Sequence, residues 1–238
     1  MKIRYRIKFF CLPFTFPNIF IFKYLANKFP RKCVYFPYDY EYSKKYIIKS
    51  FQKELLNEVN SVINILPKNK IMRTSISWNK YKFINVNLNS NNIKIPYRIG
   101  INEVENKLID NLNHTQKLIL YCIYTRHHNG FIRQKYIEKL INENNYFITP
   151  FIIQMIGEYV SEIMIIIDKY LENNIENYIK FKYENKKYWK YLRGSMASYW
   201  DTYQRNKYPK YDEYIGKIIL DKINGITMIY AHTAHNIR

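Results

Sequence analysis

Glycine, proline and cysteine are scarce in this chain, with 6 Gly, 8 Pro and 3 Cys among 238 residues. Cys11, Cys33 and Cys122 form no CxxC pair, so neither a disulfide framework nor a zinc site is expected. The few glycines do not cluster and fit no GxGxxG, Walker A or GxSxG element. A phosphate-cradling loop and a nucleophile elbow are therefore not expected either.

Histidines in metal-binding or catalytic spacing are also missing. His127 and His128 are adjacent and point to different sides of a helix or strand, so we expect a structural or solvated pair. His232 and His235 share a helix face at i, i+3, but no carboxylate accompanies them and no HExxH motif occurs. The sequence therefore predicts no metal ion and no cofactor.

The remaining candidates for chemistry are isolated. Ser195 follows Gly194 but lacks the second glycine of a nucleophile elbow. Glu158 and Glu162 are four residues apart and could share a helix face, for which we expect a solvated or capping role rather than acid-base chemistry. The sequence thus offers no catalytic residue, and the interpretation leans towards a protein that is not an enzyme.

Positive charge, by contrast, is abundant and unevenly placed. The formal net charge is +19, from 38 Lys+Arg and 19 Asp+Glu. Residues 1–50 hold 11 Lys+Arg and 2 Asp+Glu, and residues 51–100 hold 8 and 2, so the first hundred residues carry +15. A field of this size favours a polyanionic partner. The abundance of Lys, Asn, Ile, Tyr and Phe is also typical of an AT-rich coding sequence, so compositional bias is the alternative explanation.

The N-terminus resembles a signal peptide only superficially. Four basic residues precede an uncharged stretch, Phe9 to Phe22, which is too short to span a bilayer and contains Pro13 and Pro17. We expect residues 1–30 to form an aromatic arm of an intracellular, cytoplasmic protein. Association of this arm with a membrane is the less favoured alternative.

Two patterns in the first hundred residues predict regular structure. Apolar residues recur at helical spacing between Ser43 and Leu66, where Pro67 stops the pattern. Residues Tyr81–Leu88 and Ile93–Tyr97 alternate as strands, and the quartet 89–92 joins them as a hairpin. Residues 1–100 are therefore predicted to form a basic α+β region.

Residues 101–238 are predicted to be helical. Val104, Leu108 and Leu112 mark a short helix, and Thr115 is the expected N-cap of an apolar helix over Gln116–Thr125. A stripe at Tyr136, Ile137, Leu140 and Ile141 predicts the next helix after a loop ending at Gly130. Pro150 is expected in the first turn of the following helix, Gly157 at its end, and a further helix over Tyr159–Leu171.

The segment Gly130-Phe131-Ile132-Arg133, followed by Ile137, Leu140 and Pro150–Ile153, resembles the two-helix unit of HEAT-like repeat proteins. Ile163-Met164 lies 31 residues after Ile132-Arg133, and Leu192-Arg193 lies 29 residues further. The resemblance covers about residues 117–171 and is shared with uncharacterised bacterial proteins that carry an α+β segment before such an array. Met164 departs from the pattern where the family favours Arg. An ordinary helical bundle remains the alternative.

One segment, Lys180–Tyr191, interleaves basic and aromatic residues in the way that suits a nucleic-acid groove. Aromatic core residues flanked by solvated lysines would give the same pattern. The candidate polyanion contacts in this segment are Lys180, Lys182, Lys186, Lys187, Trp189 and Lys190.

Two functions follow from these observations. The resemblance implies a non-enzymatic helical-repeat scaffold that binds a protein partner through an extended surface. The alternative is a nucleic-acid-binding protein that uses the basic N-terminal region and the segment Lys180–Tyr191. The sequence does not indicate an oligomeric state.

Overall fold

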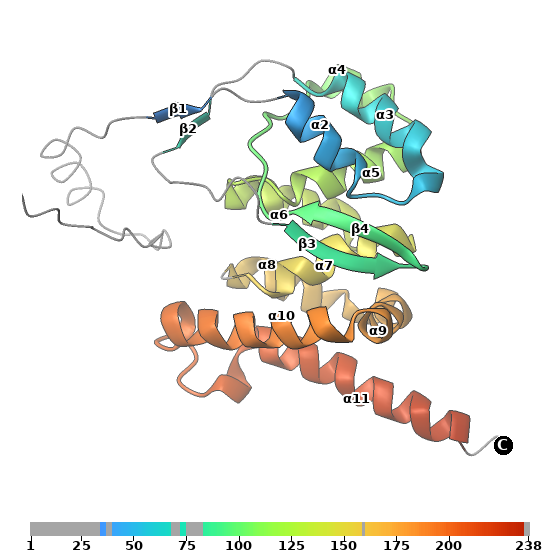
Figure 1. The fold of residues 1–238 in the computed structure, drawn as a ribbon. Coiled ribbons are helices and arrows are strands. Elements are labelled where there is room, and N and C mark those ends of the chain that lie inside the picture. The colour runs from blue at the N-terminus through green and yellow to red at the C-terminus, as the bar shows by residue number, and fades with distance from the viewer. Residues whose placement is uncertain (1–33, 37–39, 68–71, 75–82, 159, 236–238) are drawn as a thin grey trace, which may run out of the picture. The chain divides into compact units, whose positions relative to one another are not determined.

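The computed structural model describes residues 34–36, 40–67, 72–74, 83–158 and 160–235 (Figure 1). Residues Val34–Arg238 form one compact unit, which is the unit considered below. The expected aromatic arm, the N-terminal basic cluster, Cys11 and Cys33 lie outside the described residues. The described part is mainly helical and contains an antiparallel hairpin, which confirms the predicted fold class.

The elements follow one another along the chain in this order: β1 (Val34–Phe36), α2 (Tyr40–Ile48), η1 (Lys53–Leu55), α3 (Leu56–Ile65), β2 (Met72–Thr74), β3 (Phe83–Leu88), β4 (Asn91–Pro96), α4 (Asn106–Asp110), α5 (His114–Tyr124) and α6 (Gly130–Leu140). The second half continues with η2 (Tyr146–Ile148), α7 (Thr149–Ile156), α8 (Ser161–Lys169), η3 (Leu171–Asn174), α9 (Ile175–Glu184), α10 (Lys186–Tyr199), η4 (Trp200–Gln204), η5 (Tyr211–Glu213) and α11 (Ile215–His235). The short strands β1 and β2 pair with each other, and β3 pairs with β4.

The single helix predicted over Ser43–Leu66 is wrong, because the chain bends between α2 and α3. Ser50 Oγ lies 2.8 Å from Tyr46 O and 3.0 Å from Lys94 O, and Lys94 N donates to Lys49 O at 2.7 Å. A serine that bonds the carbonyl four residues back favours such a bend. The predicted stripe is nevertheless buried at Ile47, Phe51, Val59, Val62, Ile63 and Leu66, with Leu55 partly buried.

The predicted hairpin is confirmed, with a tighter turn than the expected quartet. Leu88 pairs with Asn91, so only Asn89 and Ser90 form the loop, with φ of 47° and 66°. Two consecutive positive φ values are typical of the type I′ turn that joins twisted strands. Ile84, Val86, Leu88, Ile93 and Ile95 are buried, so one face of the hairpin packs on the core, as the alternation predicts.

The helices α4 and α5 differ in detail from the sequence prediction. Leu108 of α4 is 41% exposed, while Val104 and Leu112 are buried on either side of the helix. The N-cap of α5 is Asn113 instead of Thr115: Asn113 Oδ1 accepts from Gln116 N, and Gln116 Oε1 accepts from Asn113 N. The two bonds satisfy the backbone N–H groups of Asn113 and Gln116, which would otherwise lack a partner at the start of the helix. They therefore favour a helix that begins after Asn113 over one that begins after Thr115.

The turn between α5 and α6 is formed by residues 125–129. Asn129 caps α6 by accepting from Phe131 N, so Gly130 is the first residue of the helix and does not end the loop. The stripe predicted on α6 is confirmed, since Tyr136, Ile137, Leu140 and Ile141 are buried. Pro150 also lies in the first turn of α7 and Gly157 is its C-cap, as expected.

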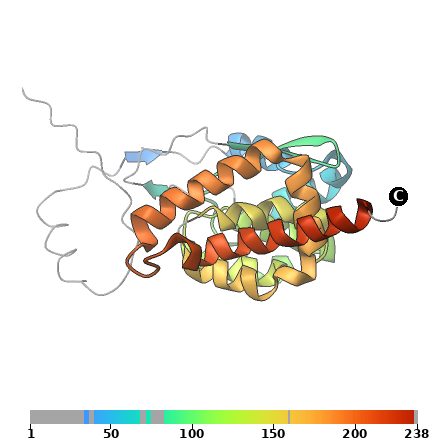
Figure 2. The same cartoon turned by 90° about the horizontal axis from the view of Figure 1, so that it is seen from below.

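The helices from α6 onward pack against one another in pairs that are not always consecutive in the chain. Helix α6 contacts α8, and α7 contacts both α8 and α9. Helix α10 then packs on α7 and α9, while α11 packs on α8, α9 and α10. Figure 2 shows α10 and α11 as the two long helices on the underside of the array. None of the described helices is long and apolar enough to cross a membrane.

Contacts cross the expected boundary at residue 100. Ile99 N donates to Arg126 O at 2.8 Å, and His128 N donates to Ile99 O at 3.0 Å. These bonds form a parallel bridge between Ile99 and His127. The chain that leaves β4 is thereby attached to the turn between α5 and α6, which brings Arg98 into the helical half.

Candidate nucleic-acid interface

The buried carboxylate of Glu158 is surrounded by three arginines. Glu158 Oε1 accepts from Arg98 Nη1 at 2.8 Å and from Arg126 Nη2. Glu158 Oε2 lies 3.1 Å from Arg133 Nε in a third ion pair. The side chains of Glu158, Arg126 and Arg133 are at most 2% exposed, and that of Arg98 is 8% exposed. The expectation that Glu158 is solvated and shares a helix face with Glu162 is therefore wrong.

This cluster has a structural role that its position explains. Arg98 follows β4, Arg126 follows α5, Arg133 lies in α6 and Glu158 follows the C-cap of α7. Arg133 Nη1 also donates to the carbonyl oxygens of His127 and His128 at 2.9 and 3.0 Å. One carboxylate thus joins four segments, and removing it would leave three buried cations without an anion.

The arginines set the ionisation of the cluster. Burial by itself raises the pKa of Glu158. Together, Arg98, Arg126 and Arg133 lower it by more than burial raises it, so the pKa lies below its usual value. Burial also lowers the pKa of Arg126 to about 10, although Glu158 opposes that shift. The carboxylate is accordingly ionised at neutral pH, and both of its oxygens are paired with arginines.

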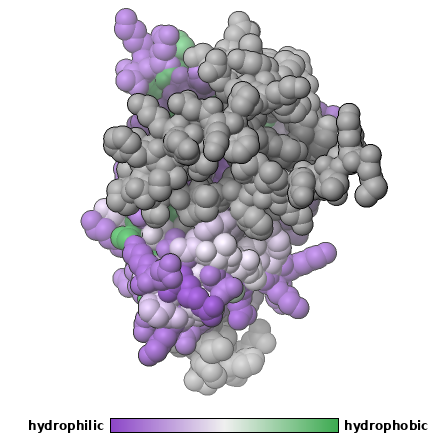
Figure 3. All heavy atoms as spheres, turned by 90° about the vertical axis from the view of Figure 1, so that its left-hand side faces the viewer, coloured by the Kyte–Doolittle hydropathy of each residue, from purple (hydrophilic) through white to green (hydrophobic). Residues whose placement is uncertain are grey.

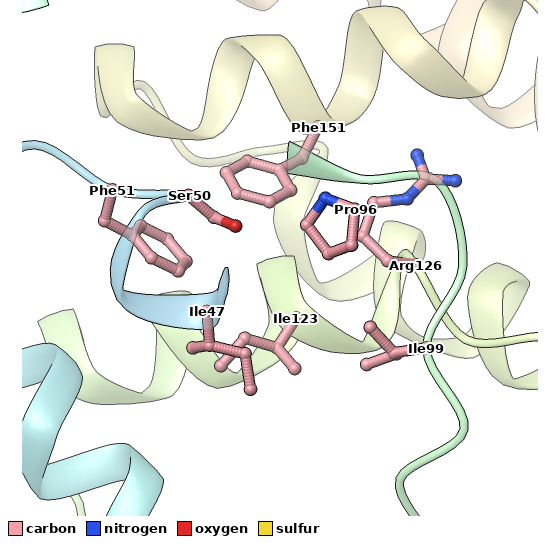
Figure 4. Close-up of a pocket in the computed structure, with 8 residues that line it drawn as sticks. All are labelled: Ile47, Ser50, Phe51, Pro96, Ile99, Ile123, Arg126 and Phe151. Atoms are coloured by element: carbon pink, nitrogen blue, oxygen red, sulfur yellow. The ribbon is translucent and has the colours of Figure 1, made fainter. Parts of the chain in front are cut away.

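A small cavity beside the cluster is too small for a substrate. Its volume is about 10 Å³, enough for one water molecule. Figure 4 shows mainly apolar side chains around it, among them Ile47, Phe51 and Phe151, with Ser50 and Arg126 as the polar residues. This cavity therefore has no room for an organic ligand.

His127 and His128 lie in the turn between α5 and α6, as the sequence indicates. His127 Nδ1 accepts from Asn129 N at 3.0 Å, and its ring is 4.2 Å from that of His128 between centroids. Burial first, and His128 second, lower the pKa of His127 to about 4. Within the described residues, no group of three or more His, Cys, Asp or Glu side chains could hold a metal ion. The side chains of His232 and His235 lie outside the described residues.

The predicted polyanion segment lies on α9 and α10, and the structure divides its residues. Lys180, Lys186, Lys187 and Lys190 are exposed. Trp189 is only 5% exposed and belongs to the core, so this residue is wrongly placed among the candidate contacts. Lys182 is half-buried, 5.9 Å from the Trp189 ring, and its pKa is lowered by burial and by Arg193. The alternation of basic and aromatic residues in the sequence therefore does not distinguish the exposed residues of this segment from the buried ones.

The exposed cations of α10 lie close together. Lys186, Lys190 and Arg193 are spaced i, i+4, i+7, which places them along one face of the helix, and Lys187 is next to them. From Lys186 to Arg193 this face is roughly 10 Å long at the rise of an α-helix. Tyr191, 52% exposed, stands among these cations. Lys186, Lys187, Lys190 and Arg193 are called the basic strip below.

The basic strip differs from its surroundings because its cations have no acidic partner among the described residues. Beyond the end of α10, Arg205 pairs with Asp201 and Lys210 with Glu213. In α11, Lys217 pairs with Asp212 and Asp221, and Lys222 pairs with Asp168. Figure 3 shows that hydrophilic residues gather on the side that includes the turn from α10 to α11. Hydrophilic surface is therefore common here, but the charge of the strip is not neutralised locally.

A second group of exposed lysines lies on the described part of the basic N-terminal region. Lys45 and Lys49 are on α2 and Lys94 is on β4, two elements that contact each other. The main-chain bond from Lys94 N to Lys49 O brings the backbones of these two residues together. Three exposed lysines of the basic region therefore lie on neighbouring elements.

The only acidic residue of the segment Lys180–Tyr191 is engaged in hydrogen bonds. Glu184 Oε2 accepts from Asn89 N at 3.1 Å and from Tyr146 OH at 3.0 Å. Its charge lies at the hairpin turn, at the end of α9 that precedes the strip.

Comparison of the chain with family models, with curated proteins and with solved structures gives no match.

Proposed function

We propose that this protein is a non-enzymatic binding protein that holds a nucleic acid on the basic strip of α10. The observation that carries the proposal is the set of four neighbouring exposed cations on α10, three of them along one helix face, without acidic partners among the described residues. Lysine and arginine contact the phosphates of a nucleic acid, and the release of counterions supplies most of the affinity of such contacts. The exposed ring of Tyr191 offers a surface on which a base can stack.

The inaccessibility of the charged cluster supports the non-enzymatic part of the proposal. Glu158 and its arginines, the strongest constellation of ionisable groups, are buried and beside a cavity that holds no more than a water molecule. A substrate would need access to such groups for catalysis. Their arrangement favours a rigid scaffold over an active site.

The experiment compares two charge reversals in a fluorescence anisotropy titration with a labelled 20-nucleotide single strand. Lys190→Glu removes a strip cation, and Lys107→Glu changes the net charge equally at an exposed position on α4. We expect Lys190→Glu to weaken binding at least several-fold at low salt, with Lys107→Glu close to wild type. Equal effects of the two substitutions, or no binding by the wild type at low salt, would contradict the proposal.

A second candidate function is a HEAT-like scaffold for a protein partner, and one observation favours it. Helix α6 packs on α8 while α7 packs on α9, which is the two-layer stacking expected of consecutive helical pairs. Phe131 of α6 and Ile165 of α8 are 79% and 50% exposed, and α6 contacts α8. The position of α10 against α7 and α9 departs from a third regular repeat.

A photo-crosslinking experiment tests this candidate. A crosslinking residue at position 131 should yield a defined protein adduct in cells, and the same residue at position 107 should not. Adducts of the same identity and yield from both positions would reject the scaffold function.

A further inference from the structure

A cleft of about 430 Å³ opens between η1, the turn of the β3–β4 hairpin and η2. This volume lies within the range of about 300–1,000 Å³ that is typical of small-molecule sites. The cleft adjoins α9, because Lys180 of that helix bonds Asn89 in its wall. It is therefore next to the segment that leads into the basic strip.

The lining of the cleft is rich in primary amides. Its lining includes Gln52, Asn89, Asn91 and Asn145, together with Glu54 and Leu55. One polar atom of three of these amides is engaged within the protein: Gln52 Nε2 donates to Leu88 O, Asn91 Nδ2 donates to Asn89 O, and Asn89 Oδ1 accepts from Lys180 Nζ. The exposed amide of Asn145 presents both a donor and an acceptor, which is the pairing that base edges present. Tyr146 adds a partly exposed aromatic ring to the same wall, whereas Phe147 is only 9% exposed and packs in the core. Amides that bond edges, beside rings that contact faces, are the combination that recognises a nucleobase.

Hydrogen bonds hold the walls of the cleft in place. Glu184 Oε2 accepts from both Asn89 N and Tyr146 OH, so one carboxylate links the hairpin turn to η2. Lys180 Nζ donates to Asn89 Oδ1 at 2.6 Å and stands 4.1 Å from the centre of the Tyr146 ring. A site formed before its ligand arrives loses less entropy on binding.

We propose that this cleft receives one unstacked base of a single-stranded nucleic acid whose phosphates lie along the basic strip. The inference rests on the proposed function and adds two points to it: that the nucleic acid is single-stranded, and that the cleft binds one of its bases. Lys180, at the edge of the cleft, neutralises the phosphate of the bound nucleotide. A duplex cannot use the cleft, because its bases are stacked and their edges are paired.

The first test measures anisotropy with matched single-stranded and duplex oligonucleotides. Asn145→Ala removes an exposed amide of the cleft, Tyr146→Ala removes a ring, and Asn111→Ala is the control at an exposed asparagine on the C-cap of α4. We expect wild type to prefer the single strand. Each cleft variant should bind the single strand about tenfold more weakly, the effect of losing one base contact, while the control binds normally.

Salt dependence separates the cleft from the strip. Lys190→Glu should reduce the slope of log affinity against log salt by about 1, because a phosphate contact is lost. Asn145→Ala should leave this slope unchanged, because a base contact releases no counterion. If Lys190→Glu weakens binding but neither cleft variant does, or if single strand and duplex bind equally, the cleft inference is wrong and the proposed function stands.

A second measurement uses only the wild-type protein, so its result does not depend on whether a variant folds. Ultraviolet crosslinking of a wild-type complex with a single strand containing 5-iodouracil, followed by mass spectrometry, should place an adduct on Tyr146. Adducts confined to Tyr191 or other residues outside the cleft would overturn the inference while supporting the strip. Absence of any adduct together with absence of oligonucleotide binding would reject both.

Discussion

Asn185 binds both main-chain polar groups of Asn87 with its side-chain amide. Asn185 Oδ1 accepts from Asn87 N at 2.7 Å, and Asn185 Nδ2 donates to Asn87 O at 2.8 Å. The amide thus takes the place that a neighbouring strand would occupy at the edge of β3. Because Asn185 lies between α9 and α10, these two bonds attach the start of the basic strip to the hairpin.

Replacement of Asn185 by Ala should destabilise the protein. The buried amide also donates to Phe181 O at 3.0 Å, so the substitution leaves several buried polar groups unpaired. We expect the free energy of unfolding to fall by about 1–3 kcal/mol, measured by urea denaturation. Asn111→Ala, at an exposed position, is the control. Equal stability of the two variants would show that the pairing with Asn87 contributes nothing.

Substitution of Glu158 by Gln should have a larger effect. Arg98, Arg126 and Arg133 would then be buried without a counter-charge, a loss of about 3–5 kcal/mol in comparable buried pairs. Urea denaturation is again the measurement. Glu162→Gln, at an exposed position of α8, should stay within about 0.5 kcal/mol of wild type. A Glu158→Gln variant as stable as Glu162→Gln would contradict the structural role of the cluster.

The same cluster predicts how stability depends on pH. Burial raises and the three arginines lower the pKa of Glu158, with a net lowering, so its stabilisation is complete above the unfolded pKa of about 4.3. It is lost as the pH falls through the lower pKa of the folded state. The difference in unfolding free energy between wild type and Glu158→Gln should therefore shrink between pH 5 and the acid limit, as followed by urea denaturation at several pH values. A constant difference would exclude the carboxylate as its source.

His127 should remain neutral through the physiological range. Burial and His128 lower its pKa to about 4, whereas the unfolded value is about 6.5. Below about pH 6.5 the unfolded chain binds the proton more tightly, so this residue reduces stability as the pH falls towards 4. Nuclear magnetic resonance of the imidazole, with His127→Gln to assign the signal, should give a midpoint well below 6. A midpoint near 6.5 would mean that the ring is solvated.

The hairpin turn offers a stabilising substitution. Ser90 has a φ of 66°, which glycine adopts without steric cost, and Asn-Gly is the preferred pair of a type I′ turn. Ser90→Gly should raise the free energy of unfolding by roughly 0.5–1 kcal/mol. Ser198→Gly in α10 should lower it by up to about 1 kcal/mol, since glycine is unfavourable inside a helix. Thermal unfolding of both variants measures the contrast, and a loss of stability in both would exclude the proposed turn geometry.

Local patterns were sufficient to predict several features correctly. The alternation of apolar residues over β3 and β4 predicts the hairpin, and the stripe over Tyr136–Ile141 predicts the buried face of α6. These predictions succeed because burial follows the period of the element itself. The break at Ser50 was missed because it depends on Lys94, which is 44 residues away in the chain.

The buried cluster left a weak signal in the sequence. Arginine is the minority cation here, 10 of the 38 Lys+Arg residues, and it is preferred over lysine in buried ion pairs. Arg126 follows an apolar helix and Arg133 lies in an apolar stripe, which could have indicated burial. Their common partner Glu158 could not be identified, because nothing local distinguishes it from Glu162.

Sequence patterns alone are enough to predict the fold class and the hairpin, to show the scarcity of catalytic motifs, and to identify the segment Lys180–Tyr191 as basic and aromatic. The folded structure is needed to show which of these residues face outwards, that Trp189 belongs to the core and that Glu184 is bonded to the hairpin turn and to Tyr146. This difference arises from the range of the interactions. Helix and strand periodicity arise from neighbours in the chain, whereas a buried ion pair or a cleft arises from segments that meet only after folding.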